Sequence, residues 1–278
     1  MKEFEFLFKD NEFYNYISPL SDAITGNVSL FGAKTANLSK AIQLGFSVPE
    51  GLAISRLCTK ETLKPLAQDI INAFGKPVAV RSSAVKEDSS TKAFAGMFET
   101  KLGIHSAEEL LDAFNDVKNS GNSEYLKKYE GKAVKQEDIA VLVQRMVDAT
   151  RAGVAFSRDP NTGEKKVIIE SNYGLGKSVV DGMITPDSIE YTDEKSKEIF
   201  IGYKSKQIIL SNNGISEKET KEEDAGKCSL SDEEIRKIAE LVSEVESRLG
   251  FPADIEWAFD TNNTLWLLQA RPITTLNL

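Results

Sequence analysis

The sequence predicts a mixed α and β protein with two lobes. Helical and strand patterns alternate along the chain without an internal repeat, and some strand patterns are paired around turn residues. The 278 residues, of which 41% are hydrophobic and 28% charged, are enough for two lobes with sizeable cores or for one large domain.

Charge and composition exclude several classes of protein. The 43 acidic residues outnumber the 34 basic ones, which argues against a general affinity for nucleic acid or anionic membranes. No run of about 18 apolar residues is present, and the first residues are too acidic for a signal peptide. Cys58 and Cys228 lack metal-ligand spacing, so we expect free thiols. We expect a cytoplasmic protein.

In the first half of the chain, helix and strand patterns alternate. Residues 33–45 have helical spacing and end at Gly45, and residues 106–120 and 122–131 each resemble a surface helix that begins near a serine. Three stretches rich in small or β-branched apolar residues predict buried strands: 51–55, 76–84 and 137–147.

In the second half, two hairpins flank a long helix. Residues 152–171 predict a hairpin that turns at 160–163, and residues 211–227 predict a solvated loop without chemistry. Ser231 and Glu234 have the spacing of a capping box. The helix that follows places one apolar stripe on a single face, made of Ile235, Ile238, Val242, Val245 and Leu249.

The terminal hairpin, residues 254–273, gathers acidic, amide and arginine side chains on one face. If Asn262 and Asn263 form the turn, Glu256 lies opposite Gln269, and Asp254 lies opposite Arg271. The other face is then apolar and can be buried: Ile255, Trp257, Phe259, Trp266, Leu268 and Ala270.

Two positively charged residues occupy positions that core packing alone does not explain. Lys34 falls in the first turn of a helix, where the helix dipole disfavours a cation but a bound phosphate would favour one. Alternatively, Lys34 is a solvated surface lysine. Arg81 ends a buried strand and needs either an internal carboxylate or an anionic ligand. The loop 89–96 that follows has the small side chains of a phosphate-covering lid, or of any surface loop.

The stretch Gly176-Lys177-Ser178 suggests a Walker P-loop. That motif requires a glycine five residues before Gly176, where this chain has Ser171. We therefore exclude a P-loop and expect Gly174 and Gly176 to permit a tight turn and close packing.

Five stretches together resemble the ATP-binding domain of the phosphoenolpyruvate synthase and pyruvate phosphate dikinase family, which also occurs in rifampicin phosphotransferases. They are "FGAKTANLSKAIQLGFSVPEG", "VAVRSSAVKEDSSTKAFAGMFET", "VLVQRMVDATRAGVAFSRDPNTG", "SNYGLGKSVVDGMITPDSIEY" and "DIEWAFDTNNTLWLLQARPIT". The resemblance implies an α+β, ATP-grasp fold whose two lobes, 1–146 and 147–278, clasp MgATP.

The resemblance also implies roles for single residues. Lys34, Arg81 and Arg271 would bind phosphates and act in catalysis, while Glu256 and Gln269 would hold Mg²⁺. Gly96 and Thr100 match positions at the base of the lid, and Gln144 and Met146 match the hinge that frames adenine.

Family members pass phosphate to a histidine on a separate mobile domain, which has no counterpart in this sequence. His105, the single histidine, precedes a surface helix and lacks the family's phosphohistidine context. We therefore expect an ATP-grasp module that phosphorylates a histidine on a partner chain or a small-molecule acceptor. The alternative is a regulatory nucleotide-binding module without turnover.

Overall fold

The computed structural model describes Phe4 and residues 16–85, 99–120, 138–193, 196–211 and 214–276. The predicted helix 122–131, the predicted lid 89–96 and Gly96 lie outside these residues. The chain divides into two compact units. Unit 1 is Met1–Gln43 with Pro49–Met146, and unit 2 is Leu44–Val48 with Val147–Leu278. The segment Leu44–Val48, which the sequence places in the first lobe, therefore packs with the second unit.

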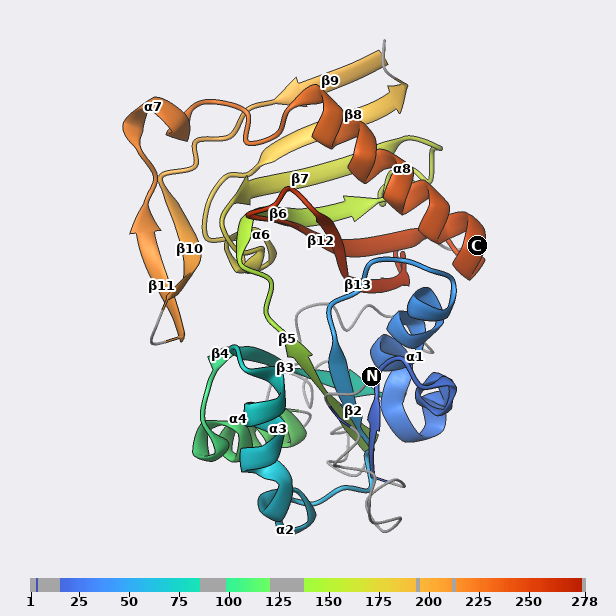
Figure 1. Cartoon of the computed structure of the whole chain (residues 1–278). Coiled ribbons are helices and arrows are strands. Elements are labelled where there is room, and N and C mark those ends of the chain that lie inside the picture. The colour runs from blue at the N-terminus through green and yellow to red at the C-terminus, as the bar shows by residue number, and fades with distance from the viewer. Residues whose placement is uncertain are drawn as a thin grey trace. The chain divides into compact units, whose positions relative to one another are not determined.

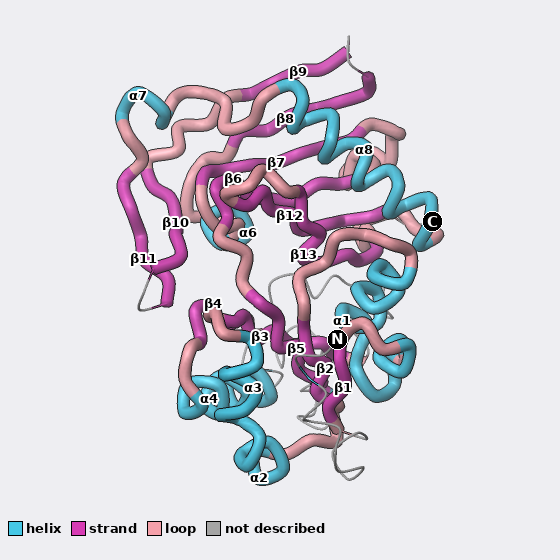
Figure 2. The backbone as a smooth tube through the Cα atoms, in the orientation of Figure 1, coloured by secondary structure: helices cyan, strands magenta, loops and turns pink. Residues whose placement is uncertain are grey.

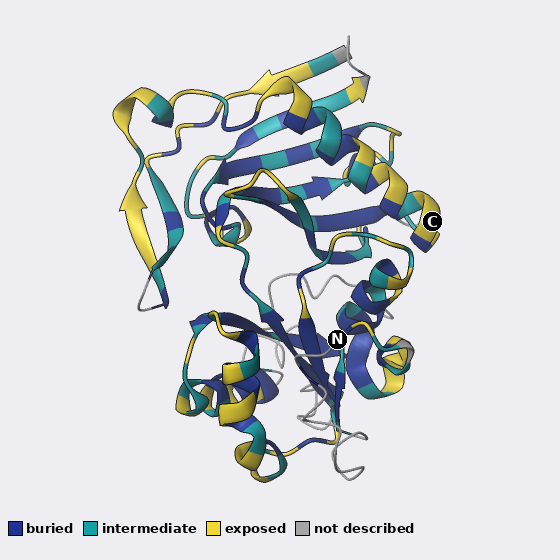
Figure 3. Cartoon of the chain, viewed as in Figure 1, coloured by how far each residue is buried: buried dark blue, intermediate teal, exposed yellow. Residues whose placement is uncertain are grey.

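Unit 1 is built on a five-stranded antiparallel sheet of order β1-β2-β5-β3-β4. Its strands are β1 (Ile17–Pro19), β2 (Gly51–Ile54), β3 (Val78–Ala84), β4 (Thr100–Ile104) and β5 (Ile139–Arg145). The three predicted buried strands are confirmed as β2, β3 and β5, since almost every residue in them is buried. Figure 3 shows them as the dark core of the unit.

Helices pack on both faces of this sheet (Figure 1). They are η2 (Ala23–Gly26), α1 (Val28–Gln43), α2 (Lys60–Leu63), η3 (Lys64–Leu66), α3 (Ala67–Phe74) and α4 (Ala107–Asn119). The face away from α1 carries the main core, in which Ile70 and Phe74 of α3 and Phe114 of α4 pack against Val78 and Val80. Ser106 caps α4 as predicted, because its side chain accepts from the backbone of Glu109.

Helix α1 is interrupted at Gly32, which has φ +75° and ψ 167°. A Cβ on Gly32 would lie 2.0 Å from the carbonyl oxygen of Ser83, so only glycine permits this approach of helix to strand. The chain resumes helical geometry after the break, and the Ser83 hydroxyl accepts from the backbone N–H of Thr35 at 3.1 Å. The helix predicted from residue 33 thus begins anew beside β3.

Unit 2 is built on a six-stranded antiparallel sheet of order β13-β12-β6-β7-β8-β9. Its strands are β6 (Ala149–Phe156), β7 (Val167–Tyr173), β8 (Asp187–Asp193), β9 (Ser196–Phe200), β12 (Ala253–Asp260) and β13 (Leu265–Pro272). The predicted hairpin 152–171 is confirmed as β6 and β7.

Helix α8 (Asp232–Leu249) covers one face of this sheet (Figure 1). All five residues of the predicted apolar stripe are buried, and the predicted capping box of Ser231 and Glu234 is present. Arg151 on β6 forms an ion pair with Glu234, which fixes the α8 side as the face of Arg151, Gly153 and Ala155. The opposite face, named here the open face because α8 does not cover it, carries Val154 and its cross-strand neighbours, and the short helix Lys177–Val180 packs on part of it, where Asn172 donates to the Ser178 hydroxyl at 2.8 Å.

The predicted loop 211–227 is wrong, because this stretch contributes to regular structure (Figure 2). Strands β10 (Lys206–Ser211) and β11 (Gly214–Glu219) form a two-stranded ribbon, followed by α7 (Glu222–Ala225). The ribbon is attached where Leu175 N–H donates to the Ile208 carbonyl at 2.7 Å. Gly174, with φ +73°, permits this contact, since a Cβ there would lie 2.2 Å from the same oxygen. The short helix α6 (Lys177–Val180) follows.

A fully buried ion pair anchors the segment between β9 and the ribbon. Lys204 Nζ lies 2.7 Å from Asp187 Oδ1, and both side chains have no exposed surface. The second oxygen of Asp187 accepts from the backbone and the hydroxyl of Ser229, each at 2.7 Å. Gly202 donates to Asp187 at 3.1 Å, and a Cβ on it would lie 2.1 Å from the Thr185 carbonyl. Every partner of the carboxylate is thus supplied by the chain itself.

The β12–β13 hairpin has the predicted register from Ala253 to Glu256 and a different one beyond it. The register shifts by one residue after Glu256 because β13 contains an extra residue, Leu268. As a result Leu267 is buried, while Trp266 and Leu268, predicted to be buried, are partly exposed. The turn also differs from the predicted one: Asn263 N–H donates to the Asp260 carbonyl at 3.0 Å, so Thr261 and Asn262 are the central residues and Asn263, with φ +60°, follows them.

The segment Leu44–Val48 is tied to unit 2 at three points. Leu267 N–H donates to the Ser47 carbonyl at 2.8 Å. Arg248 donates to the Leu44 carbonyl at 2.6 Å, and its guanidinium lies 5.6 Å from the centre of the Phe46 ring. This segment therefore extends the β13 edge of the unit.

Candidate functional site

In unit 1, Lys34 stands in the first turn of the resumed part of α1, directly after the break at Gly32. The first backbone N–H groups of a helix lack partners within the helix and give that end a partial positive charge. Lys34 adds a full charge at the same place. Such a helix N-terminus favours an anion, but one of its N–H groups, that of Thr35, is already bonded to the Ser83 hydroxyl.

Three further predicted residues share the α1 face of the unit 1 sheet. Arg81 pairs with Thr100 across β3 and β4, and Gln144 pairs with Ala79 across β5 and β3. Because Arg81 and Ala79 are two residues apart, all of these side chains leave the same face as Ser83, which contacts α1. The structure thus gathers Lys34, Arg81, Thr100 and Gln144 on one side of unit 1.

The predicted hinge residues are held firmly within unit 1. The Gln144 side-chain amide donates to the Pro49 carbonyl at 3.4 Å, and the Met146 backbone N–H donates to the Pro77 carbonyl at 3.1 Å. Met146 Sδ accepts from Gly103 N–H at 3.0 Å. The N–H of Met146 is therefore engaged internally.

In unit 2, Glu256 and Gln269 are direct partners across the hairpin, as predicted. They lie on the open face, because Ile255 and Trp257, their neighbours along the strands, are fully buried on the α8 side. Glu256 is partly exposed, and Gln269 is buried. Two oxygen-bearing side chains thus meet on a sheet face that α8 does not cover.

Arg271 is held by the aspartate that the sequence placed opposite it. Its Nη2 lies 2.7 Å from Asp254 Oδ2, and its Nε donates to the same oxygen at 2.8 Å. Burial raises the pKa of Asp254, Arg271 opposes this effect, and the neighbouring Glu256 carboxylate adds to it. The arginine is consequently oriented on the open face by an internal acid.

Sequence reasoning missed Glu170 of β7. Glu256 pairs with Val154 of β6, and Val154 pairs in turn with Glu170, so the row Gln269, Glu256, Val154, Glu170 crosses the open face. Burial, and then the charge of Asp254, raise the pKa of Glu170. The signal was a lone acid on the polar side of an otherwise apolar strand, "VIIES".

The oxygen ligands on the open face fit Mg²⁺ only if bound phosphates supply further ligands. Glu256 and Gln269 offer hard oxygen ligands, and Mg²⁺ usually takes one or two protein carboxylates plus water and substrate phosphates. Within the ranges that the structure describes, no cluster of three His, Cys, Asp or Glu side chains could hold a metal ion unaided.

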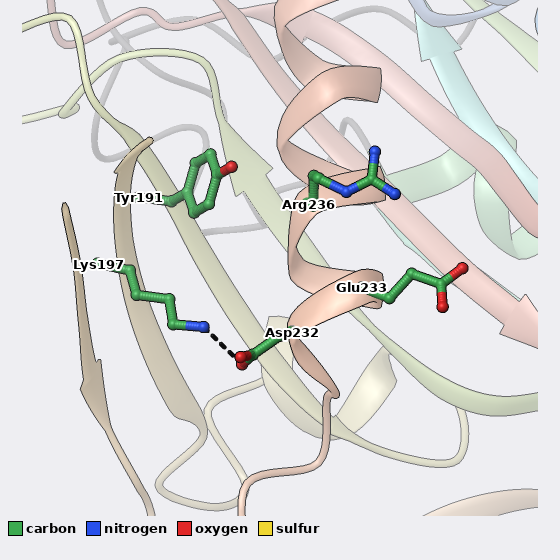
Figure 4. A pocket seen from close by; sticks show the side chains of 5 residues that line it. All are labelled: Tyr191, Lys197, Asp232, Glu233 and Arg236. Carbon is green, nitrogen blue, oxygen red and sulfur yellow. Dashed lines mark ion pairs between the residues drawn. The ribbon is translucent and has the colours of Figure 1, made fainter. Parts of the chain in front are cut away.

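A polar pocket of about 390 Å³ lies on the other side of the unit 2 sheet (Figure 4). Its lining residues are Tyr191, Lys197, Asp232, Glu233 and Arg236. Lys197 is paired there with Asp232 at 2.5 Å, and Glu233 with Lys237 at 2.7 Å. Because α8 contributes three of these five residues, the pocket is separate from the open face.

His105 immediately precedes the cap of α4, as expected for a helix-entry residue. Its Nδ1 lies 3.2 Å from the Gly103 carbonyl and 3.1 Å from the Glu109 carboxylate. Cys58 and Cys228 are free thiols, as expected. No described helix has the length and apolar composition needed to cross a membrane.

Comparison with known proteins gives a family match, several similar sequences and a distant structural neighbour. The family model described as "Pyruvate phosphate dikinase, AMP/ATP-binding domain" matches residues 58–278. The D-alanine-D-alanine ligase from Coxiella burnetii is a distant structural neighbour, with a TM-score of 0.40 and 11% identity over 92% of this chain and 51% of that one.

Three curated proteins are similar in sequence. The chain is 33% identical to an uncharacterized phosphotransferase of Bacillus subtilis, YvkC, over 89% of its own length and 34% of that protein's. It is 37% identical to a probable phosphoenolpyruvate synthase of Archaeoglobus fulgidus over 72% and 27% of the two lengths. It is 32% identical to the rifampicin phosphotransferase of Bacillus subtilis over 78% and 26%. The chain therefore spans about a third or less of these relatives.

Proposed function

The chain belongs to the pyruvate phosphate dikinase family of AMP/ATP-binding domains, and on this premise we propose that it binds MgATP and donates a phosphoryl group to a separate acceptor. The more specific part of the proposal is that this transfer is of the dikinase type. The observation that carries it is the pairing of Glu256 with Gln269 beside Arg271 on the open face.

Phosphate binding is assigned to Lys34, Arg81 and Arg271. A phosphoryl transfer site needs positive charge and alignment more than covalent chemistry, because charge spreads over the oxygens of the transferred group. Lys34 adds its charge to a helix N-terminus, and Arg271 is already oriented by Asp254. These groups would hold the phosphates and neutralise charge as it develops.

Magnesium binding is assigned to Glu256 and Gln269. When bound, Mg²⁺ would shield the phosphate charges and so favour attack on phosphorus. The protein would supply a carboxylate and an amide oxygen that already face each other. Adenine is assigned to Gln144 and Met146, and the base of the phosphate-covering loop to Thr100 together with Gly96.

The acceptor in this proposal is a histidine of a partner chain or a small molecule. His105 is assigned no part, since its ring is engaged with Gly103 and Glu109 beside a surface helix. The relatives extend well beyond the region that this chain matches. The second candidate is a regulatory module that binds nucleotide without turnover. The Asp254–Arg271 ion pair is compatible with it, because an arginine that is already paired can have a structural role alone.

The test is to incubate the purified protein with ATP and Mg²⁺, with and without candidate partners encoded nearby, and to follow products by phosphorus NMR and mass spectrometry. The proposal expects slow turnover alone, stimulation by one acceptor, and a new phosphorylated species. AMP as the nucleotide product supports a dikinase, and ADP supports a simple kinase. Tight ATP binding without turnover under every condition would favour the regulatory module.

A further inference from the structure

Glu170 has a defined position on the open face of unit 2. It stands in one cross-strand row with Glu256 and Gln269, separated from Glu256 by Val154 alone. Adjacent strands lie about 4.8 Å apart, so the Cα atoms of Glu170 and Glu256 are roughly 10 Å apart. The two acids therefore flank a strip of sheet that is wide enough for part of a nucleotide.

The backbone around Glu170 leaves little freedom. A Cβ on Gly153 would lie 1.8 Å from the Glu170 carbonyl oxygen, so β6 and β7 approach each other there in a way that only glycine allows. The adjacent Ser171 is fully buried, and its hydroxyl lies 2.8 Å from that of Ser229. The strand is thus fixed on its α8 side, and Glu170 is presented on the open side.

The Glu170 carboxylate needs a donor once a ligand covers it. It is half-buried beside Val154 and Ile168, and no hydrogen bond or ion pair joins it to the residues that the structure describes. The nearby Asp254 is already paired with Arg271. Covering a carboxylate without supplying a hydrogen bond or a cation is costly. A ligand on this face must therefore bring a donor to Glu170.

Few groups of MgATP meet this requirement. Phosphate oxygens are repelled by a carboxylate, and the proposed function assigns the adenine edge to Gln144 and Met146. The proposed metal site takes Glu256 and Gln269, a direct cross-strand pair, whereas Glu170 is one strand farther away. The ribose hydroxyls remain. We propose, as an extension of the proposed function, that Glu170 is a nucleotide-positioning residue that accepts a hydrogen bond from a ribose hydroxyl.

The test compares the affinities of the wild type, Glu170→Ala and Glu170→Gln for ATP, 2′-deoxyATP and 3′-deoxyATP, measured by calorimetry with Mg²⁺. The wild type should bind ATP roughly tenfold or more tightly than one deoxy analogue, as expected for a hydrogen bond to a charged group. Glu170→Ala should bring that ratio close to one by weakening ATP alone. Glu170→Gln, which keeps an acceptor oxygen, should give an intermediate ratio.

Glu190→Gln is the matched control. Glu190 also lies on the open face, next to Ile168, but its carboxylate is paired with Lys166 at 2.7 Å. Its variant should leave the ratio unchanged. The assignment to ribose is overturned if Glu170→Ala keeps the wild-type ratio, weakens all three nucleotides equally, or changes the Mg²⁺ dependence instead. A wild type that binds none of the nucleotides overturns the proposed function as well.

Discussion

Asp254 and Arg271 face each other across the β12–β13 hairpin, with two guanidinium nitrogens 2.7 and 2.8 Å from one carboxylate oxygen. The pair gives Arg271 a fixed direction on the open face. It also means that loss of Arg271 leaves an acid that is 8% exposed without its cation. Structural and ligand-binding roles of this arginine must therefore be separated experimentally.

Arg271→Ala should lower the free energy of unfolding by up to about 3 kcal/mol, because it removes one partner of a largely buried pair. In an Asp254→Asn background the same substitution should cost much less stability. If Arg271 binds phosphate, it should still weaken ATP binding in that background. Urea unfolding and calorimetry of all four proteins make the comparison. Recovery of ATP affinity in the double variant would assign Arg271 a structural role alone.

Glu256→Ala and Gln269→Ala should each reduce the enhancement of ATP affinity by Mg²⁺ at least roughly tenfold, while the melting temperature changes little. Calorimetry with and without Mg²⁺ measures this enhancement. Mg²⁺ alone should bind weakly to the wild type, since the described residues offer no cluster of three ligand side chains. Glu198→Ala, at an exposed position of β9, is the control. Equal ATP affinity with and without Mg²⁺ in the wild type would refute the metal assignment.

Lys34→Ala and Arg81→Ala should each lower ATP affinity at least roughly tenfold, the typical effect of losing a charge-assisted hydrogen bond. Their melting temperatures without nucleotide should stay near that of the wild type. Lys40→Ala, at an exposed position near the end of α1, should change neither quantity. A large loss of melting temperature in either site variant would instead show that its cation pairs with a carboxylate of the protein.

Lys118 should make the stability of unit 1 depend on pH. Lys118 is 5% exposed, and its amine donates to the carbonyls of Arg56 and Ile139. Burial lowers the pKa of Lys118 from 10.5 to about 8. Below pH 8 the folded protein carries a disfavoured charge. Between pH 8 and 10.5 the folded protein releases this proton before the unfolded chain does, so its stability should rise.

The neighbouring thiol acts in the opposite direction, because burial raises the pKa of Cys58 from 9.0 to about 12. Above pH 9 ionisation of the unfolded thiol should lower stability. Both effects are separated by comparing Cys58→Ala with Cys58→Ala/Lys118→Met in urea unfolding from pH 7 to 11. The rise should be present in the first protein and absent from the second. Parallel profiles would refute the assignment to Lys118.

Asp187→Asn and Lys204→Met should each lower the free energy of unfolding by about 3–5 kcal/mol, because each leaves a fully buried partner without its charge. Amide hydrogen exchange should show the loss of protection first in β10 and β11, because these strands follow Lys204 directly in the chain. Lys227→Ala removes an exposed pair with Asp224 and should cost less than about 1 kcal/mol. Similar losses in Lys227→Ala and Lys204→Met would contradict the role of the buried pair.

Periodicity and capping signals sufficed where one buried face decides the structure. The α8 stripe, its capping box and the strands β2, β3 and β5 are as predicted, because helical spacing and continuous apolar runs translate directly into burial. The loop predicted at 211–227 failed because a two-stranded ribbon with mostly exposed residues has no apolar pattern. It is attached through Gly174 and the backbone of Ile208, and such contacts leave little trace in a sequence.

The candidate site was also predicted only in part. Pairing arithmetic found Glu256 with Gln269 and Asp254 with Arg271, because these pairs precede the bulge at Leu268. It failed nearer the turn, where Leu267 is buried instead of Leu268, since a bulge depends on local backbone geometry. Glu170 was missed because its row depends on how β12, β6 and β7 align, which no single segment encodes.

The short segment Leu44–Val48 determines how the molecule can be dissected. The chain leaves unit 1 after Gln43, contributes these residues to unit 2, and returns at Pro49, so neither unit is a single uninterrupted stretch. A fragment of residues 147–278 would lack the Ser47 carbonyl that Leu267 binds and the Phe46 ring that Arg248 covers. Separate expression of the second unit would have to restore that missing edge, for instance by joining residues 44–48 through a linker.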